Sequence, residues 1–381
     1  MNFMLFLLLS YFIRGRCMLE IMIFMKQRNN TITLMKALAI ICMVAGHSYT
    51  GSPIESFVGL FHMPVFFFCS GYCFKEKYLS DIKSYTKRKI LTMWWPTFKW
   101  IILLVLLHNI LLSIGVLRGE TCGGFAVAAY GFKETIKYFC MAVILHADDP
   151  VFAGIWFIKM LLISSVLGFI VIKCCNGVSF YLALMGLLVM SVLMLELFPR
   201  HMPIIHQLHL PFLSSFFFLT GYFFKRNRVF EELRIRKIYM FSVAVISIIF
   251  LVSGYHYWLS SMVSLSMERC LPFCVSAIAG IILVYNISKK ASEITPPNLL
   301  EYVKFLGNNT YAIFMMHILS FRLMSAILIL CCGLDWNRLA DFPTIHFMTE
   351  KGFWIAYLIF GINLPLLVQF IYNKICCIWK K

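Results

Sequence analysis

The stretch Thr33-Leu-Met-Lys36-Ala-Leu-Ala-Ile-Ile-Cys-Met-Val-Ala-Gly-His47 is an apolar run that holds one lysine and one histidine. Eleven helical residues make about three full turns, so Lys36 and His47 share one helix face, roughly 16 Å apart along the axis. A cation and an imidazole are costly inside a membrane and usually serve a function there. The alternative is that Lys36 snorkels to one headgroup layer while His47 lies in the other.

The composition is that of a membrane protein. Hydrophobic residues make up 61% of the chain and charged residues 13%, whereas a soluble domain has about 45–50% and about 25%. The net charge of +17 would suit a nucleic-acid partner. However, the basic residues cluster in short loops between apolar runs, as the positive-inside rule produces. The sequence therefore predicts an all-α, polytopic membrane protein that contacts membrane lipids and binds no nucleic acid.

The hydropathy pattern predicts about ten transmembrane helices in one bundle. If both termini are cytoplasmic, the inner loops carry 21 Lys and Arg residues and the outer loops carry 7. This excess predicts a multi-pass protein of the cell (inner or plasma) membrane with both termini in the cytoplasm. The ten apolar runs cover residues 32–50, 54–74, 91–113, 154–173, 178–197, 204–224, 238–257, 269–287, 308–332 and 353–373.

The chain divides into an N-terminal extension, 1–25, and one membrane domain, 26–381. The extension is apolar but too short to span, so we expect an interfacial segment or a start codon placed too early. The longest outer connection is 113–153. We expect a packed loop there, and an amphipathic helix from Lys133 to His146 is the alternative.

The cysteines and histidines do not form a metal-binding pattern. The 14 Cys residues show no Cys-x-x-Cys spacing and lie mostly in apolar runs, where they act as small hydrophobic residues. His206 and His209 are three residues apart, but no local acid or third histidine completes a set of ligands. We therefore expect no metal. Phosphate-binding glycine motifs and a Gly-x-Ser-x-Gly motif are also absent.

One motif occurs twice. Phe66-Phe-Phe-Cys-Ser-Gly71-Tyr72-Cys-Phe-Lys75 returns as Phe216-Phe-Phe-Leu-Thr-Gly221-Tyr222-Phe-Phe-Lys225, with seven of ten positions identical. Each copy ends an apolar run at a basic loop, so the two copies share one polarity. Two explanations of the repeat are open. One is an internal duplication, and the other is convergence on a sequence that suits the end of a transmembrane helix, with a small residue, an aromatic residue and a cation.

The strongest candidates for chemistry are His47 and His62. We expect the first two spans to form a tight hairpin, with His47 near the outer end of the first and His62 about two turns into the second. The two imidazoles can then approach each other, and Pro64 permits a kink beside them. Imidazole is well suited to taking a proton from a hydroxyl near neutral pH. The alternative for His62 is a hydrogen bond to a neighbouring helix.

Other polar residues in or beside the apolar runs are weaker candidates. His317 and Arg322 lie in the ninth span, five residues apart and therefore not on one face. Trp156 and Lys159 lie at the start of the fourth span, where both also suit an interfacial anchor. Lys87, Arg88 and Lys89, together with Lys36, suit the phosphates of an anionic cytosolic cofactor, although topology alone also explains them.

Several motifs together resemble the acyltransferase family 3 of integral-membrane O-acyltransferases. Lys36 followed by ten residues and His47 resembles that family's Arg/Lys-x10-His motif. The supporting matches are Arg28-Asn-Asn-Thr-Ile-Thr-Leu, Phe61-His-Met-Pro-Val-Phe-Phe-Phe-Cys-Ser-Gly-Tyr72, the basic run before Pro96, Trp156-Phe157 and Leu306-Gly-Asn-Asn-Thr-Tyr-Ala-Ile-Phe-Met-Met-His317. They cover about residues 25–375, and the Phe-His-Met-Pro form resembles the fucose-4-O-acetylase-like branch.

The resemblance implies a ten-helix enzyme that moves an acyl group, usually acetyl from acetyl-CoA, to a hydroxyl. The implied acceptor is a cell-surface polysaccharide or its lipid-linked precursor. Catalysis is carried over to His47 and a charge role to Lys36. Lysine stands where arginine is commoner in the family, so a bidentate phosphate clamp is not available here.

The residues suggest a direct attack in which His47 deprotonates the acceptor hydroxyl and His62 orients His47 or polarises the carbonyl. An acyl-histidine stage is also open. The rival function is a transporter or flippase for a glycolipid or small solute, which the repeated motif mildly favours. His62 has no counterpart in the second copy, and this difference favours the enzyme. A catalytically inactive regulatory protein would leave Lys36 and His47 unexplained.

Overall fold

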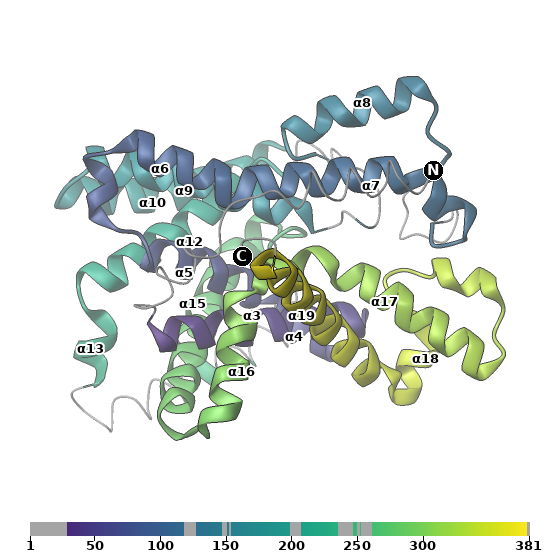
Figure 1. Cartoon of the computed structure of the whole chain (residues 1–381). Coiled ribbons are helices and arrows are strands. Elements are labelled where there is room, and N and C mark those ends of the chain that lie inside the picture. Colours follow the sequence, from purple (N-terminus) through teal and green to yellow (C-terminus); the bar gives the residue numbers. More distant parts are fainter. Residues whose placement is uncertain are drawn as a thin grey trace.

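The computed structural model describes residues 29–117, 127–146, 151, 154–198, 207–234, 247–249, 252 and 261–378. The regular elements among these residues are all helical (Figure 1), so the predicted all-α class is confirmed. The extension 1–25, His206 and most of the predicted span 238–257 lie outside the described residues.

Eight helical stretches of the described part are long and apolar enough to cross a membrane. They coincide with the first five and the last three predicted spans. An 18-residue helix, α12, lies where the sixth span was expected. The first elements are α3 (Asn30–Ser48), α4 (Pro53–Gly59), α5 (His62–Tyr72), η1 (Glu76–Leu79), α6 (Ile82–Lys89), η2 (Ile90–Trp94), α7 (Trp95–Ser113), α8 (Phe132–Val143), α9 (Ile155–Cys174) and α10 (Val178–Leu197). The others are α12 (His209–Arg226), α13 (Val229–Arg234), α15 (Met267–Ile294), α16 (Pro297–Asn308), α17 (Thr310–Cys332), η4 (Trp336–Ala340), α18 (His346–Met348), η5 (Thr349–Phe353) and α19 (Trp354–Ile378).

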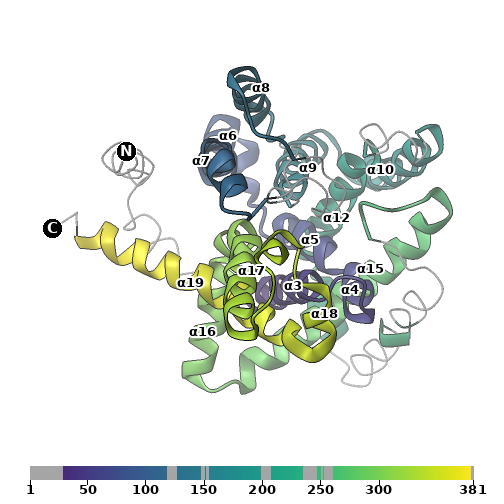
Figure 2. The same ribbon diagram turned by 90° about the vertical axis from the view of Figure 1, so that its right-hand side faces the viewer.

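Helix α3 is the centre of the bundle. Its first turn begins at the N-cap Asn29, whose side chain accepts a hydrogen bond from the Ile32 amide. Figure 2 shows α3 enclosed by neighbouring helices, and it packs against α4, α5, α15, α16, α17 and α19. At Gly307, near the end of α16, an added Cβ would lie 2.2 Å from the Thr33 carbonyl oxygen, so glycine permits this close contact. The helix that carries Lys36 and His47 is therefore surrounded by protein.

The second span is broken where a kink was predicted. Helix α4 ends at Gly59, α5 begins at His62, and Leu60 and Phe61 form a turn between them. Pro64 has no amide to donate to the carbonyl four residues earlier, which weakens helical bonding at this point. His62 is consequently the first residue of α5. It still lies about two turns beyond the start of the second span at Pro53, as the sequence predicted, but a break separates it from those turns.

The connection 113–153 contains a helix where a packed loop was expected. Helix α8 runs beside α7 (Figure 1), and the indole nitrogen of Trp94 donates to the Val143 carbonyl oxygen at 2.9 Å. At the other end, Asn109 exchanges two hydrogen bonds with the backbone of Tyr130. Helix α8 therefore packs along the length of α7, and the expectation of a packed loop in this connection was wrong.

The repeated motif is the contact between α5 and α12. A Cβ on Gly71 would lie 1.7 Å from the Phe218 carbonyl oxygen, and a Cβ on Gly221 would lie 2.0 Å from the Phe68 carbonyl oxygen. The equivalent aromatic pairs also match, because Phe68 contacts Phe224 and Phe74 contacts Phe218. The two copies thus pack against each other in a nearly symmetric way, and each glycine admits the backbone of the other helix.

Arg322 anchors the segment between α17 and α19. Arg322 is only 3% exposed, and its guanidinium donates to the carbonyl oxygens of Leu339, at 2.9 Å, and Asp341. Nearby, the Tyr357 hydroxyl bonds the Ser325 hydroxyl at 2.8 Å and accepts the Ile345 amide at 3.3 Å. These contacts give Arg322, a candidate substrate residue, a structural role.

Replacing Arg322 by alanine should lower the free energy of unfolding by about 3 kcal/mol, because buried carbonyl groups lose a charged donor. The midpoint of thermal unfolding of the purified protein measures this loss. Arg338→Ala is the matched control, since the Arg338 side chain is 52% exposed and pairs with Asp341 at 3.4 Å. The control should cost about 0–1 kcal/mol. Equal losses in both variants would show that Arg322 is not the anchor.

Candidate active site

Three histidines from three helices lie together in the bundle. The rings of His47 on α3 and His317 on α17 have centroids 5.4 Å apart and are tilted by 30°. His47 also lies within electrostatic range of His62, the first residue of α5, as well as of His317. His47 is therefore the middle member of the cluster. Beside the predicted approach of His47 and His62, His47 makes a contact to His317 that was not predicted.

Two of these imidazoles are oriented by the backbone of their own chain segment. His62 Nδ1 lies 2.7 Å from the Val58 carbonyl oxygen, at the end of α4. His317 Nδ1 lies 2.8 Å from the Phe314 carbonyl oxygen and 3.2 Å from that of Ile313. A carbonyl oxygen only accepts, so each Nδ1 carries the proton and donates. In the neutral rings each Nε2 then keeps a lone pair and is a basic nitrogen.

Lys36 lies on the same helix as His47, within a single α-helix that runs from Asn30 to Ser48. The predicted common face therefore holds in the structure. Lys36 is half-buried and lies within electrostatic range of Cys69 on α5. The lysine is thus turned toward the interior of the bundle and not solely toward the surrounding lipid.

Aromatic side chains line the region next to the histidines. Phe157 on α9 contacts Phe66 at 5.5 Å and Phe314 at 5.1 Å between ring centroids, which joins α9 to α5 and α17. Trp156 and Lys159 belong to the same first turns of α9 and are half-buried. Phe157 is buried and is linked to the cluster through Phe314, whose ring centroid lies 6.3 Å from that of His317.

A polar contact joins α7 and α17 and was not predicted. The Tyr311 hydroxyl and the Thr97 hydroxyl are 3.0 Å apart. The only sequence signal was a polar residue near each helix start, after Pro96 and after Asn309. Such a signal does not reveal which helices meet.

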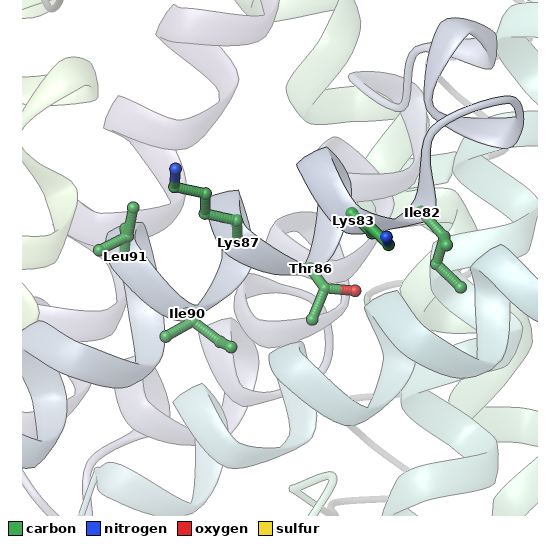
Figure 3. A pocket seen from close by; sticks show the side chains of 6 residues that line it. All are labelled: Ile82, Lys83, Thr86, Lys87, Ile90 and Leu91. Carbon is green, nitrogen blue, oxygen red and sulfur yellow. The ribbon is translucent and has the colours of Figure 1, made fainter.

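The basic residues before Pro96 point in different directions. Lys87 is exposed and, with Lys83, borders an open and largely apolar surface depression that runs along α6 and into η2 (Figure 3). Arg88 donates to the Tyr78 hydroxyl at 2.6 Å, and the Lys89 amine donates to the Ser165 hydroxyl at 2.7 Å. Lys87 is thus exposed, whereas Arg88 is half-buried against Tyr78 and Lys89 bonds to α9.

In the part of the chain that the structure describes, no three His, Cys, Asp or Glu side chains are grouped so as to hold a metal ion. The site as described consists of imidazoles with basic nitrogens, a cation on the same helix and an aromatic wall. Imidazoles in this arrangement can take a proton from a hydroxyl and give it back.

Comparison with known proteins identifies the family. No curated protein and no solved structure matches the chain. Residues 29–372 match the family described as an acyltransferase domain, and this match contains all three clustered histidines and most of the chain. The chain therefore belongs to this acyltransferase family and is an α-helical membrane acyltransferase.

Proposed function

We propose that the protein transfers an acetyl group from acetyl-CoA to a hydroxyl of a cell-surface polysaccharide or of its lipid-linked precursor. The observation that carries this proposal is the place of His47, between two other imidazoles inside the bundle of an acyltransferase. The Phe61-His-Met-Pro64 form supports the fucose-4-O-acetylase-like branch of the family.

In the proposed reaction His47 is the general base. It takes the proton of the acceptor hydroxyl as the hydroxyl oxygen attacks the thioester carbonyl carbon. The new carbon–oxygen bond forms, the carbon–sulfur bond breaks, and the leaving thiolate of coenzyme A takes the proton back from His47. His62 can donate no hydrogen bond from Nε2 while its Nδ1 is protonated, so in its neutral form it is a second base and does not polarise the carbonyl.

The basic residues favour an anionic donor from the cytosol. Lys36, Lys87 and Arg88 are the side chains proposed to attract the phosphates of acetyl-CoA. We place the protein in the cell membrane with both termini in the cytoplasm, because this orientation puts most Lys and Arg residues in the inner loops. Trp156 and Lys159, at the start of α9, are proposed to contact the acceptor.

The direct test uses membranes from cells that express the full chain, supplied with acetyl-CoA labelled in its acetyl group. Label should enter membrane glycan and be released by mild alkali, which cleaves esters. Membranes without the chain give the background. If no acetyl label enters glycan, while a glycolipid labelled in its sugar crosses the membrane chemically unchanged, the transporter is supported instead.

Lys36→Ala should raise the apparent KM for acetyl-CoA about tenfold, because one partly buried charge contact to a phosphate contributes roughly 1.4 kcal/mol or more. Lys36→Arg keeps the charge and should stay within about threefold of the wild type. Labelled transfer at varied acetyl-CoA measures both. An unchanged KM in Lys36→Ala, with normal protein level, would remove Lys36 from donor binding.

A further inference from the structure

The Nε2 atom of His317 is buried and forms no hydrogen bond in the described structure. His317 is only 3% exposed, and its Nδ1 is already bound to carbonyl oxygens of its own helix. A buried acceptor without a donor costs free energy, so native proteins keep such atoms mainly where they have a role.

Among the rings that contact His317, one can donate a hydrogen bond to its Nε2 atom. The described ring contacts of His317 are His47, Phe314 and Phe321. Phenylalanine rings have no N–H or O–H group, so His47 is the ring contact that can donate to Nε2.

The separation of the two imidazoles fits such a bond. Two imidazoles joined edge to edge by an N–H···N bond of about 2.9 Å have centroids roughly 5.2 Å apart. The observed separation is 5.4 Å with a tilt of 30°. The distance between the two rings is therefore close to the distance that an N–H···N bond between them requires.

We propose that His317 positions the base of the acyl transfer, by accepting at Nε2 a hydrogen bond from one ring nitrogen of His47. The inference rests on the proposed function of His47. Nδ1 of His317 is held by the Phe314 and Ile313 carbonyl oxygens, so Nε2 is the atom that receives the bond. This bond leaves the other nitrogen of His47 unprotonated and fixed in direction, which is what a general base requires. When that nitrogen takes the hydroxyl proton, the bond to His317 stabilises the imidazolium.

Two amide variants of His317 separate this role from packing. In His317→Asn the amide can still donate to the helix carbonyls but cannot reach the place of Nε2, whereas in His317→Gln the amide oxygen reaches that place. His317→Asn should reduce the apparent kcat by roughly tenfold or more, with little change in the KM for acetyl-CoA. His317→Gln should stay within about threefold of the wild type. The assay is the labelled transfer into membrane glycan, with protein level equalised.

Several outcomes would overturn the proposal: a wild-type kcat in His317→Asn, equal losses in both variants, or a raised KM with an unchanged kcat. A second measurement does not depend on activity. If the two rings are bonded, the double variant His47→Ala/His317→Asn should melt close to the less stable single variant, because one lost bond is counted once. Additive shifts contradict the pairing. Absence of transfer in the wild type would refute the proposed function, and the melting cycle would still decide the pairing.

Discussion

His47→Ala should reduce acyl transfer by about 10²–10⁴-fold, the contribution expected of a positioned general base. The reason is that alanine removes the nitrogen proposed to take the hydroxyl proton. The remaining imidazoles are oriented differently, since His62 and His317 each commit Nδ1 to a backbone carbonyl oxygen. Transfer of labelled acetyl into membrane glycan, normalised to the amount of protein in the membrane, measures the loss.

His346→Ala is the control for a general effect of losing a histidine. Its side chain is 68% exposed and pairs with Glu350 at 3.5 Å in the turn before α19. This variant should keep wild-type transfer, because the pair is solvent-exposed and contributes little. If His47→Ala retains half of the wild-type transfer or more while folding normally, His47 is not the base.

The positions of the membrane helices follow closely from the sequence. The predicted spans 154–173 and 178–197 became α9 (Ile155–Cys174) and α10 (Val178–Leu197). Long apolar runs are reliable because a helix must bury all its backbone polar groups to cross lipid. The fold class is therefore the part that composition and hydropathy determine most strongly.

The contacts between helices were much harder to predict. A span that is apolar on all sides carries no periodic signal for the face that meets a partner, because lipid is as apolar as a neighbouring helix. His47 and His317 are far apart in the sequence, and no pattern in either segment points to the other. The sequence identified both as candidates but paired His47 with His62.

Helix breaks and helical segments were predicted better than the packing of one segment on another. Pro64 correctly indicated a disturbance in the second span, although the break at Leu60 and Phe61 moved His62 to a helix start. For the connection containing α8, the expected packed loop was wrong, and the amphipathic pattern of residues 133–146 correctly indicated a helix. Trp94 and Asn109 hold α8 in place, but they belong to the third span and not to the connection. Nothing in the sequence indicated that they contact this connection.

The repeated motif now has a physical explanation that does not require transport. Gly71 and Gly221 each allow the backbone of the opposite helix to approach closely. Where the two copies end, the Lys225 amine donates to the Phe74 carbonyl oxygen at 2.6 Å. The C-terminal ends of α5 and α12 thus lie on the same side. A close crossing of parallel helices requires a small residue at the same place in both.

Gly71→Ala and Gly221→Ala should each destabilise the protein by about 3 kcal/mol or more. Alanine favours a helix over glycine by about 1 kcal/mol, so propensity alone predicts the opposite sign. The added Cβ would, however, lie 1.7 Å or 2.0 Å from a carbonyl oxygen of the facing helix, and a backbone atom cannot rotate away. The helices must separate, and the aromatic packing around Phe68 and Phe218 is lost with them.

Gly186→Ala supplies the matched control, because an added Cβ there meets nothing within 4 Å on α10. This variant should be neutral or slightly stabilising, as helix propensity predicts. Thermal unfolding of the three purified variants compares the two effects directly. Stabilities of Gly71→Ala and Gly221→Ala equal to that of Gly186→Ala would mean that α5 and α12 do not cross at their glycines. Because His62 begins the same helix that carries Gly71, loosening this crossing should also lower acyl transfer in any protein that remains folded.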